Sequence, residues 1–253
     1  MPGLAQIRRL EAAAFRAWPA TSVQHEGTWS VRLTASHPSR RLNSVNPLDP
    51  HDHDDIPARV ERVGKKFRDY GRPLTFRQSP LAPPELSRYL DERGFKRVGH
   101  SLVMSAAIDK LATDNAFDQI PLQDIGRYVD ASIVIHEHDA HMKPGLSEVI
   151  SAIKPTAGMF VLEDDDGPVS SVICVQDGNL AGILDMGTRV EQKRQGKGRR
   201  LLAAALKWAK SRGANTAWLQ VESDNQAARK MYEALGFEPA YSYFYLVDKE
   251  HRL

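Results

Sequence analysis

Apolar residues recur at steps of three and four along several stretches of the chain, a spacing that predicts amphipathic helices. Residues 4–17 carry this pattern, and Pro19 closes it. A second stripe runs from Ile56 to Phe67. Further helices are predicted over residues 84–93, 122–135, 144–153, 201–209 and 225–235.

Short runs that alternate in polarity, or are apolar throughout, predict β-strands between these helices. They cover Trp29–Leu33, Arg41–Val45, Pro73–Phe76, Met159–Glu163, Val169–Gln176, Leu180–Gly187 and Ala217–Val221, with a longer strand from Phe95 to about Ala106. Asp164–Gly167 joins two of them as a hairpin turn. Helices and strands mix throughout, which indicates an α/β (α+β) fold class with mixed β-sheets flanked by helices.

One segment of this pattern occurs twice. Arg88–Met104 (RYLDERGFKRVGHSLVM) aligns with Lys230–Leu246 (KMYEALGFEPAYSYFYL) at a constant offset of 142. Each copy reads as a helix, a Gly-Phe pair and a strand. The elements before each copy also follow the same order, so we predict two domains of one topology: residues 1–106 and 117–253, joined by a linker over residues 107–116.

A basic glycine loop follows the predicted strand Leu180–Gly187. Gly196 and Gly198 lie in it, just before a predicted helix. Glycine lets the backbone amides turn toward one point, and a helix N-terminus adds free N–H donors and partial positive charge. The flanking cations are Lys193, Arg194, Lys197, Arg199 and Arg200. This combination suits a phosphate or pyrophosphate.

Two common phosphate loops do not fit this stretch. The Walker loop needs Ser or Thr after its Gly-Lys, whereas Arg199 follows Gly198 here. The dinucleotide fingerprint needs a third glycine, which is absent at that spacing.

A second motif lies downstream, in NQAARKMYEALGF. Asn225 and Tyr232 are seven residues apart, about two helical turns, so both side chains point to one face. We expect Asp224 to cap this helix and Gly236 to end it in the left-handed conformation.

Taken in order, the strand, the basic glycine loop, the Asn-to-Tyr helix and the Gly-Phe pair resemble the GNAT superfamily of acetyl-CoA-dependent N-acetyltransferases. The resemblance covers about residues 120–247. The family's loop pattern is Gln/Arg-x-x-Gly-x-Gly/Ala, and Lys193 stands at its first position. Lysine keeps the charge of arginine but not its planar fork.

The resemblance implies direct transfer of an acetyl group from acetyl-CoA to a primary amine of a small molecule or peptide. It implies that Tyr232 is the general acid that protonates the departing thiolate. The residues expected to bind the coenzyme are Thr188, Arg189, Val190, Lys193, Arg194, Gln195, Gly196, Lys197, Gly198, Arg199, Arg200, Asn225, Ala228 and Tyr232. Candidates for a general base are Asp185, Glu222 and Glu137, and a chain of water molecules is the alternative.

The first half resembles a degenerate copy of the same GNAT-like domain. Where the phosphate loop should be, it has the acidic stretch Asn46–Asp55 (NPLDPHDHDD), and Leu90 stands in the place of Tyr232. An acidic loop repels a pyrophosphate, so we expect this half not to bind coenzyme A. We expect it instead to close one wall of the acceptor pocket.

Two histidine groups could suggest a metal, but no distant ligand accompanies either, and we expect no metal. His51 and His53 lie in the acidic stretch, where such residues often cap a helix. His136–His141 lies between two predicted helices, a loop that the resemblance places at the acceptor site; a plain surface turn is the alternative.

Composition narrows the remaining classes. The net charge of +2 over 253 residues gives no global argument for nucleic acid or a membrane as partner. The single cysteine, Cys174, lies in an apolar run, and no signal-like or membrane-spanning run is evident. We therefore expect a cytoplasmic protein, monomeric or homodimeric. A non-catalytic acyl-CoA sensor or interaction protein on the same fold is the alternative function.

Overall fold

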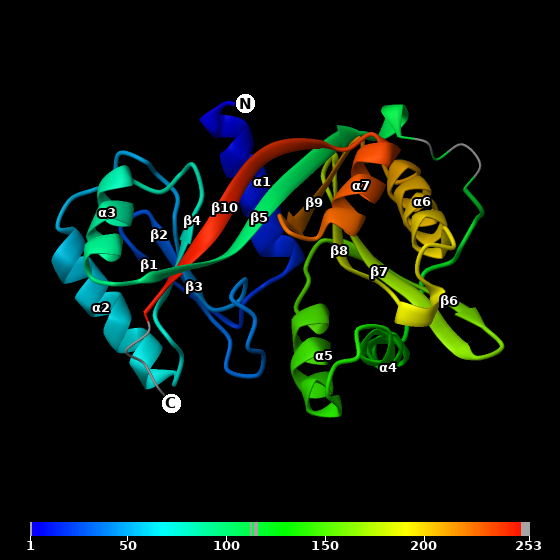
Figure 1. Cartoon of the computed structure of the whole chain (residues 1–253), viewed down its shortest axis with the longest axis horizontal. Coiled ribbons are helices and arrows are strands. Elements are labelled where there is room, and N and C mark those ends of the chain that lie inside the picture. Colours follow the sequence, from blue (N-terminus) through cyan, green and yellow to red (C-terminus); the bar gives the residue numbers. More distant parts are fainter. Residues whose placement is uncertain (1, 112, 114–115, 249–253) are drawn as a thin grey trace.

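The computed structural model describes residues 2–111, 113 and 116–248. Its strands form one sheet that runs the length of the molecule, in the order β1-β2-β3-β4-β10-β5-β9-β8-β7-β6 (Figure 1). The first half holds α1 (Leu4–Ala17), β1 (Ser22–Glu26), β2 (Trp29–Leu33), β3 (Ser44–Pro47), α2 (Ile56–Asp69), β4 (Thr75–Gln78), α3 (Pro84–Glu92) and β5 (Lys96–Ala107).

The second half begins after a short 3-10 turn, Ile108–Lys110. It holds α4 (Ile125–Ile135), α5 (Lys143–Ser151), β6 (Thr156–Asp164), β7 (Gly167–Asp177), β8 (Leu180–Thr188), α6 (Lys197–Lys210), β9 (Thr216–Glu222), α7 (Gln226–Leu235) and β10 (Glu238–Val247). Two further 3-10 turns, η2 (Ala140–Met142) and η3 (Val190–Gln192), precede α5 and α6.

The two halves contribute equivalent strands to the sheet in the same order. Counted inward from β1 or from β6, each strand of one half has the position of its counterpart in the other half. In each half the first three strands are antiparallel neighbours, and the third pairs with the fourth in parallel. The last strands cross over: β10 lies between β4 and β5, and β5 lies between β10 and β9. These are the strands of the Gly-Phe repeat, so the repeated sequence does mark equivalent elements.

This crossover joins the halves more closely than two separate sheets would. Ser101 of β5 lies opposite Tyr243 of β10 on one side and Glu222 of β9 on the other. A cut at residue 106 would therefore remove the strand that separates β9 from β10, so experiments on this protein need the full chain. Residues 112, 114 and 115 of the predicted linker lie outside the described residues.

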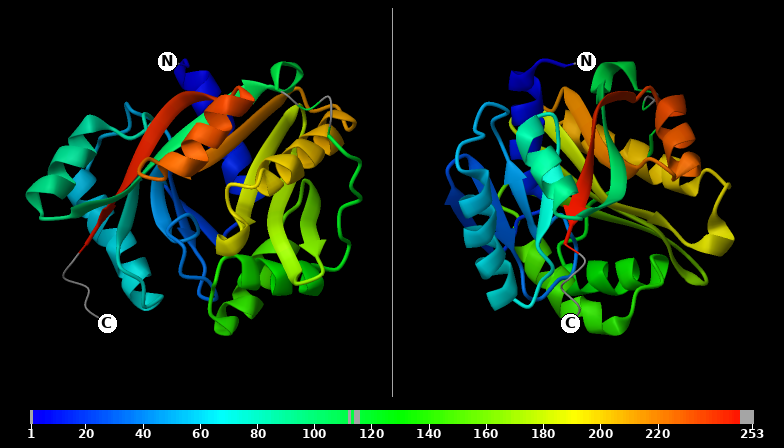
Figure 2. Two further views of the ribbon diagram at one scale, coloured as in Figure 1. Left: turned by 45° about the vertical axis from the view of Figure 1, so that its right-hand side comes forward. Right: turned by 60° about the vertical axis from the view of Figure 1, so that its left-hand side comes forward.

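Alternate side chains of the second-half strands serve two cores on opposite faces of the sheet. Ile173 and Leu184 belong to the core that α1, α4 and α5 cover, whereas Cys174 and Ile183 belong to the core under α6 and α7 (Figure 2). Helix α1, although part of the first half, reaches across to the second, where Arg16 pairs with Asp177 at 2.7 Å.

Several boundaries differ from those predicted. Strand β1 was missed because its sequence, SVQHE, is polar and mostly exposed. Strands β3 and β4 lie two to three residues later than predicted, so Asn46 and Pro47 are in β3 and outside the acidic loop. β3 and β4 are each only four residues long, so few residues mark their boundaries in the sequence. Phe76 of β4 lies opposite Val45 of β3.

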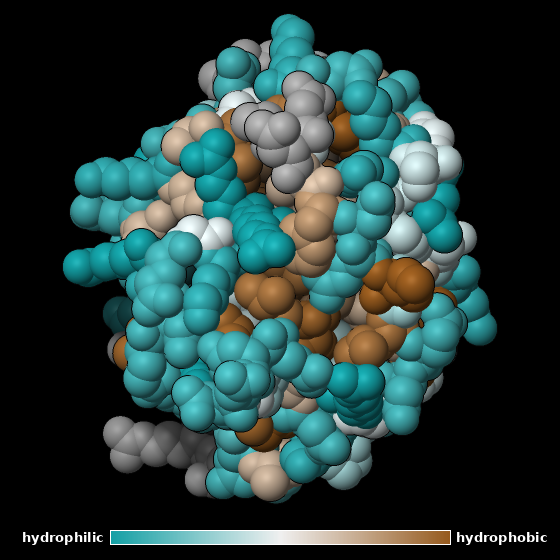
Figure 3. All heavy atoms as spheres, turned by 90° about the vertical axis from the view of Figure 1, so that its right-hand side faces the viewer, coloured by the Kyte–Doolittle hydropathy of each residue, from teal (hydrophilic) through white to brown (hydrophobic). Residues whose placement is uncertain are grey.

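The end of the molecule formed by the second half has a mostly hydrophilic surface, with hydrophobic side chains gathered toward its middle (Figure 3). Val134 of α4 and Val190 of η3 are each about half exposed. In the described part of the chain, no helix combines the length and the apolar character needed to cross a bilayer.

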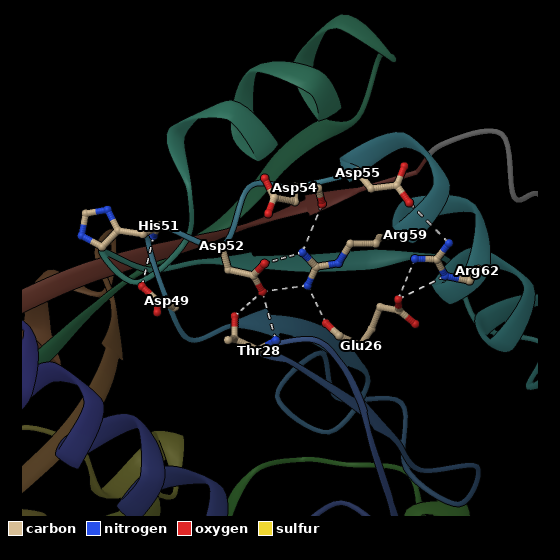
Figure 4. A network of polar contacts seen from close by, with 9 residues as sticks. All are labelled: Glu26, Thr28, Asp49, His51, Asp52, Asp54, Asp55, Arg59 and Arg62. Atoms are coloured by element: carbon tan, nitrogen blue, oxygen red, sulfur yellow. Dashed lines mark hydrogen bonds and ion pairs between the residues drawn. The ribbon is translucent and has the colours of Figure 1, made fainter.

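The acidic loop of the first half is bound to its own helix. Both carboxylate oxygens of Asp52 accept hydrogen bonds from the guanidinium of Arg59 on α2, at 2.7 and 2.9 Å, and Thr28 donates to the same carboxylate (Figure 4). These bonds hold the pKa of Asp52 well below its usual range. Asp52 thus already pairs with the cation that α2 presents to this loop.

Candidate active site

The site forms where two parallel strands part. β8 and β9 pair only from Leu180–Ile183 to Thr216–Leu219, yet β8 continues to Thr188 and β9 to Glu222. Just beyond the last pair, Asp185 has a positive φ of 49° and the register with β7 shifts, which marks a β-bulge. Among the described residues, β8 therefore has no strand partner beyond Ile183 on the side of β9.

A cavity of about 620 Å³ opens beside this parting. Of the residues predicted to bind the coenzyme, Thr188, Val190, Lys193, Arg194, Gly196, Lys197, Gly198, Arg199, Asn225, Ala228 and Tyr232 line it. Arg189, Gln195 and Arg200 belong to the same loop and helix but do not line the cavity. The other lining residues are Ile135, His136, Glu137, Met186, Gly187, Gln192, Ala227 and Met231.

The two glycines of the loop serve different geometric needs. Gly196 is the N-cap of α6 and has a φ of 74°, in the left-handed region that glycine adopts without strain. Gly198 lies against β8: a Cβ there would come within 2.6 Å of Thr188 Oγ1. Together they let the first turn of α6 approach the strand, and the first amides of that turn have no acceptor within the helix.

The cations around this helix terminus are not equally available. Lys197 Nζ pairs with Asp164 at 3.2 Å, and the guanidinium of Arg200 stacks on the ring of Phe117. Within residues 2–111, 113 and 116–248, no carboxylate lies within ion-pair distance of Lys193, Arg194 or Arg199, which all line the cavity. Three positive charges and the N-terminus of α6 thus lie beside one cavity, an arrangement that suits a pyrophosphate.

Helix α7 is capped one residue later than predicted. The side chain of Asn225, rather than that of Asp224, accepts the hydrogen bond from the Ala228 amide at 3.1 Å. Gly236 ends the helix with a φ of 108°, as predicted. The cap fixes the start of α7, and Asn225 and Tyr232 both line the cavity, two turns apart.

Tyr232 lines this cavity. Its side chain is buried, and its ring packs edge-on against Phe237 at 6.0 Å between centroids. Burial raises the pKa of Tyr232 to about 12, an effect that the nearby charge of Arg41 opposes. The phenol is therefore protonated at neutral pH and able to donate its proton.

The base candidates lie in three different settings. The carboxylate of Asp185 accepts hydrogen bonds from the hydroxyls of Tyr128 at 2.8 Å and Ser132 at 2.7 Å, both on α4. Glu137 is exposed but lines the cavity. Glu222 is exposed at the end of β9 and lines none of the cavities described here.

His136 belongs to this group, although the sequence singled out its loop rather than the residue. Its Nε2 lies 3.3 Å from Asp185 Oδ1, and its ring lines the cavity. The ring also touches the backbone of β8, because a Cβ at Gly187 would lie 2.6 Å from His136 Cε1. His136 and the oriented carboxylate of Asp185 therefore lie together where β8 and β9 separate.

The histidine-rich loop His136–His141 contains three possible metal ligands, His136, His138 and His141. His136 stacks on His138 at 5.3 Å between ring centroids, and His141 pairs with Asp139 at 2.8 Å on the surface. Among the residues that the structure describes, no three His, Cys, Asp or Glu side chains converge as a metal-binding group.

The family model described as "Probable histone acetyltransferase Rv0428c C-terminal" matches residues 4–246. The chain belongs to this family. It is thus a GNAT-type N-acetyltransferase by family, and the match includes both halves of the shared sheet.

Relatives of this Rv0428c-like family member are also named as N-acetyltransferases. The "Uncharacterized N-acetyltransferase YobR" of Bacillus subtilis (strain 168) is 24% identical over 252 residues, covering 96% of this chain and 99% of that one. The "N-alpha-acetyltransferase 30" of Schizosaccharomyces pombe is 41% identical over 83 residues, 31% of this chain and 55% of the relative.

Solved structures with the same fold span both halves. A "GCN5-related N-acetyltransferase from Kribbella flavida" superposes with a TM-score of 0.71 at 21% identity, covering 96% of this chain and 95% of that one. A "Tandem GNAT protein from the clavulanic acid biosynthesis pathway" has a TM-score of 0.65 at 13% identity, covering 94% and 87%. The GNAT fold class predicted from the sequence is confirmed.

Proposed function

We propose that this family member is an acetyl-CoA-dependent N-acetyltransferase that acetylates the primary amine of a small molecule by direct transfer, and that it acts in the cytoplasm. The observation that carries the proposal is the cavity at the parting of β8 and β9. It combines the glycine cradle of α6, three cations without a carboxylate partner and a buried phenol.

The residues present fit the coenzyme. The amides of the first turn of α6, with Lys193, Arg194 and Arg199, would hold the pyrophosphate. Residues 184–188 of β8, which lack a partner strand on the β9 side, would bind the extended pantetheine arm through their backbone. When bound, acetyl-CoA supplies the activated acetyl group as a thioester.

Two proton transfers then fall to this chain's own residues. An amine that arrives as an ammonium ion must first lose a proton, which we assign to His136, with Asp185 as the positioning residue. Once the neutral nitrogen has formed the new C–N bond, it loses a second proton to solvent. The C–S bond breaks on the other side, and Tyr232 donates its phenol proton to the departing thiolate sulfur. A positioned acid or base typically contributes about 10²–10⁴-fold in rate.

Amide hydrogen exchange of the full chain tests the location of the coenzyme site. Acetyl-CoA should slow exchange in residues 186–200 and 225–232, because these segments line the cavity. Residues 46–55 should exchange at the same rate with and without it, because Asp52 and Arg59 already pair there. Protection confined to residues 46–55 would place the coenzyme in the first half and contradict the proposed site.

The role of His136 predicts a specific pH dependence. His136→Gln should lower kcat/KM by about 10²-fold near neutral pH. The defect should shrink as the pH rises through the pKa of the amine, because an amine that is already neutral does not need His136 for the first proton transfer. The measurement is kcat/KM against pH for both enzymes.

His141→Gln is the matched control, since His141 is on the same loop but exposed and paired with Asp139. It should keep wild-type rates. A His136→Gln defect of constant size across the pH range would assign this residue to substrate positioning and leave the base unidentified.

A further inference from the structure

A second, smaller cavity lies at the base of the strand parting, on the side of the first half. Three arginines from separate strands or loops reach it: Arg32 of β2, Arg41 before β3 and Arg77 of β4. Ile183 and Leu184 of β8 line the same cavity. Its volume is about 30 Å³. The second half alone could not form it.

Only one of these three charges is balanced by a carboxylate. Glu11 of α1 accepts two hydrogen bonds from Arg77, at 2.7 and 2.9 Å, and both side chains are almost wholly buried. Tyr241 donates to the same carboxylate at 2.6 Å. In the described chain, no carboxylate lies within ion-pair distance of Arg32 or Arg41.

Arg32 is the most unusual of the three. It is 2% exposed, its guanidinium stacks on the ring of Phe15, and its Nη2 donates to the backbone carbonyl of Trp18. Its Nε has no hydrogen-bond partner among the described residues. Burial and the neighbouring charge of Arg77 lower the pKa of Arg32 to about 10, so the side chain is still a cation at neutral pH. A buried, charged donor without a partner costs free energy that a bound anion would recover.

The positive charges of these arginines also affect the pKa of Tyr243. Burial by itself would raise its pKa, but the charges of Arg77 and Arg41 lower the pKa of Tyr243 to about 8. The guanidinium carbon of Arg77 lies 3.3 Å from the centroid of this ring. The surroundings of the cavity therefore favour negative charge.

We propose that this arginine cavity binds the carboxylate of the acceptor, so that the substrates are small molecules with an amine at one end and a carboxylate at the other, as short peptides have. This inference rests on the proposed acetyltransferase function. The cavity has room for about two water molecules, which matches a carboxylate better than a bulkier anion. The Nε of Arg32 and the guanidinium of Arg41, neither with a carboxylate partner in the described chain, offer charged donors that a carboxylate accepts.

The acceptor can extend from this cavity toward His136, where its amine would react. A neighbouring cavity of about 200 Å³ shares Trp18, Arg41 and Leu184 with it and reaches Asp185. From Ile183 to Gly187, where His136 packs, β8 advances four residues, roughly 13 Å. An acceptor with its carboxylate at the arginines must therefore span about 13 Å to place its amine near His136, the length of about four residues of extended peptide, whereas an α-amino acid is too short.

Calorimetry on the full chain tests carboxylate recognition without requiring turnover. The probes are N-acetyl-triglycine, N-acetyl-tetraglycine and N-acetyl-8-aminooctanoate, which resemble products, each against its uncharged carboxamide at low chloride. At least one acid should bind about 30-fold or more tightly than its amide. Arg32→Met, which keeps the length of the side chain but removes its charge, should abolish this difference. Arg88→Met, on exposed α3, should preserve it.

Acetyl-CoA is titrated into the same variants. Unchanged coenzyme affinity in Arg32→Met together with loss of acid binding supports the inference. Acids and amides that bind alike, or no acid binding in a wild-type chain that binds acetyl-CoA, would overturn it and leave the proposed function standing. Inorganic phosphate binding more tightly than every acid would also overturn the carboxylate assignment. Arg41→Gln serves as the second variant where Arg32→Met does not fold.

Discussion

Replacing Tyr232 by phenylalanine is expected to lower turnover by about 10²–10⁴-fold while leaving the affinity for acetyl-CoA close to that of the wild type. The substitution removes one hydroxyl and keeps the ring that packs against Phe237. Without the phenol proton, the thiolate must leave as an anion inside a cavity that is partly buried. The loss should therefore appear in kcat, measured by release of free coenzyme A thiol.

Tyr70→Phe is the control, because Tyr70 is exposed at the end of α2, in the first half. It should have wild-type turnover. If single-turnover measurements, in which chemistry limits the rate, gave equal rates for Tyr232→Phe and the wild type, Tyr232 would have no part in the proton transfer.

Replacing Gly198 by glutamate should weaken acetyl-CoA binding by more than about 10²-fold, with the fold retained. A Cβ at this position would come within 2.6 Å of Thr188 Oγ1 and 3.0 Å of Met186 Cε, so the first turn of α6 must move away from β8. The added carboxylate would also repel a pyrophosphate at the helix N-terminus. Calorimetric titration gives the affinity, and circular dichroism checks the fold.

Gly3→Glu is matched to this change in residue types and in its place at a helix N-terminus. Gly3 is the N-cap of α1, and a Cβ there would meet no atom within 4 Å. This control should bind acetyl-CoA normally. An unchanged affinity in a folded Gly198→Glu protein would refute the location of the pyrophosphate.

Local sequence was enough to predict most of the elements and the candidate coenzyme cavity. Glycines at 196 and 198, flanking cations and a two-turn spacing from Asn225 to Tyr232 are contiguous features, and in the structure most of these residues line one cavity. The N-cap of α7 was the exception. Asp and Asn are nearly equal caps, so the sequence alone could not separate Asp224 from Asn225.

The crossover of β5 and β10 could not be predicted in this way. The repeat identified both strands as equivalent, but their pairing depends on contacts across more than a hundred residues. The sequence pattern of each strand is the same whether it pairs within its own half or with the other. Only the structure shows that the last strands are exchanged within one sheet.

The arginine cavity was missed for a related reason. The alternation of apolar and polar residues in Trp29–Leu33 predicted a strand but did not mark Arg32 as buried. In the structure all five residues of β2 are buried, because α1 and the second half cover the outward face. The pairing of His136 with Asp185 likewise joins the C-cap of α4 to a residue of β8. Such sites depend on which faces of helices and strands pack together. The polarity pattern of one strand does not show this.

The central claim is that this chain transfers an acetyl group from acetyl-CoA to an amine, and the most direct test follows the group itself. The full chain is incubated with acetyl-CoA labelled with ¹³C in its acetyl group and with a panel of amino acids and other small amines, and the products are identified by mass spectrometry. The account predicts one labelled N-acetyl amide for each coenzyme A thiol released. Tight coenzyme binding without label on any amine would contradict it, and would instead support an acyl-CoA sensor on the same fold.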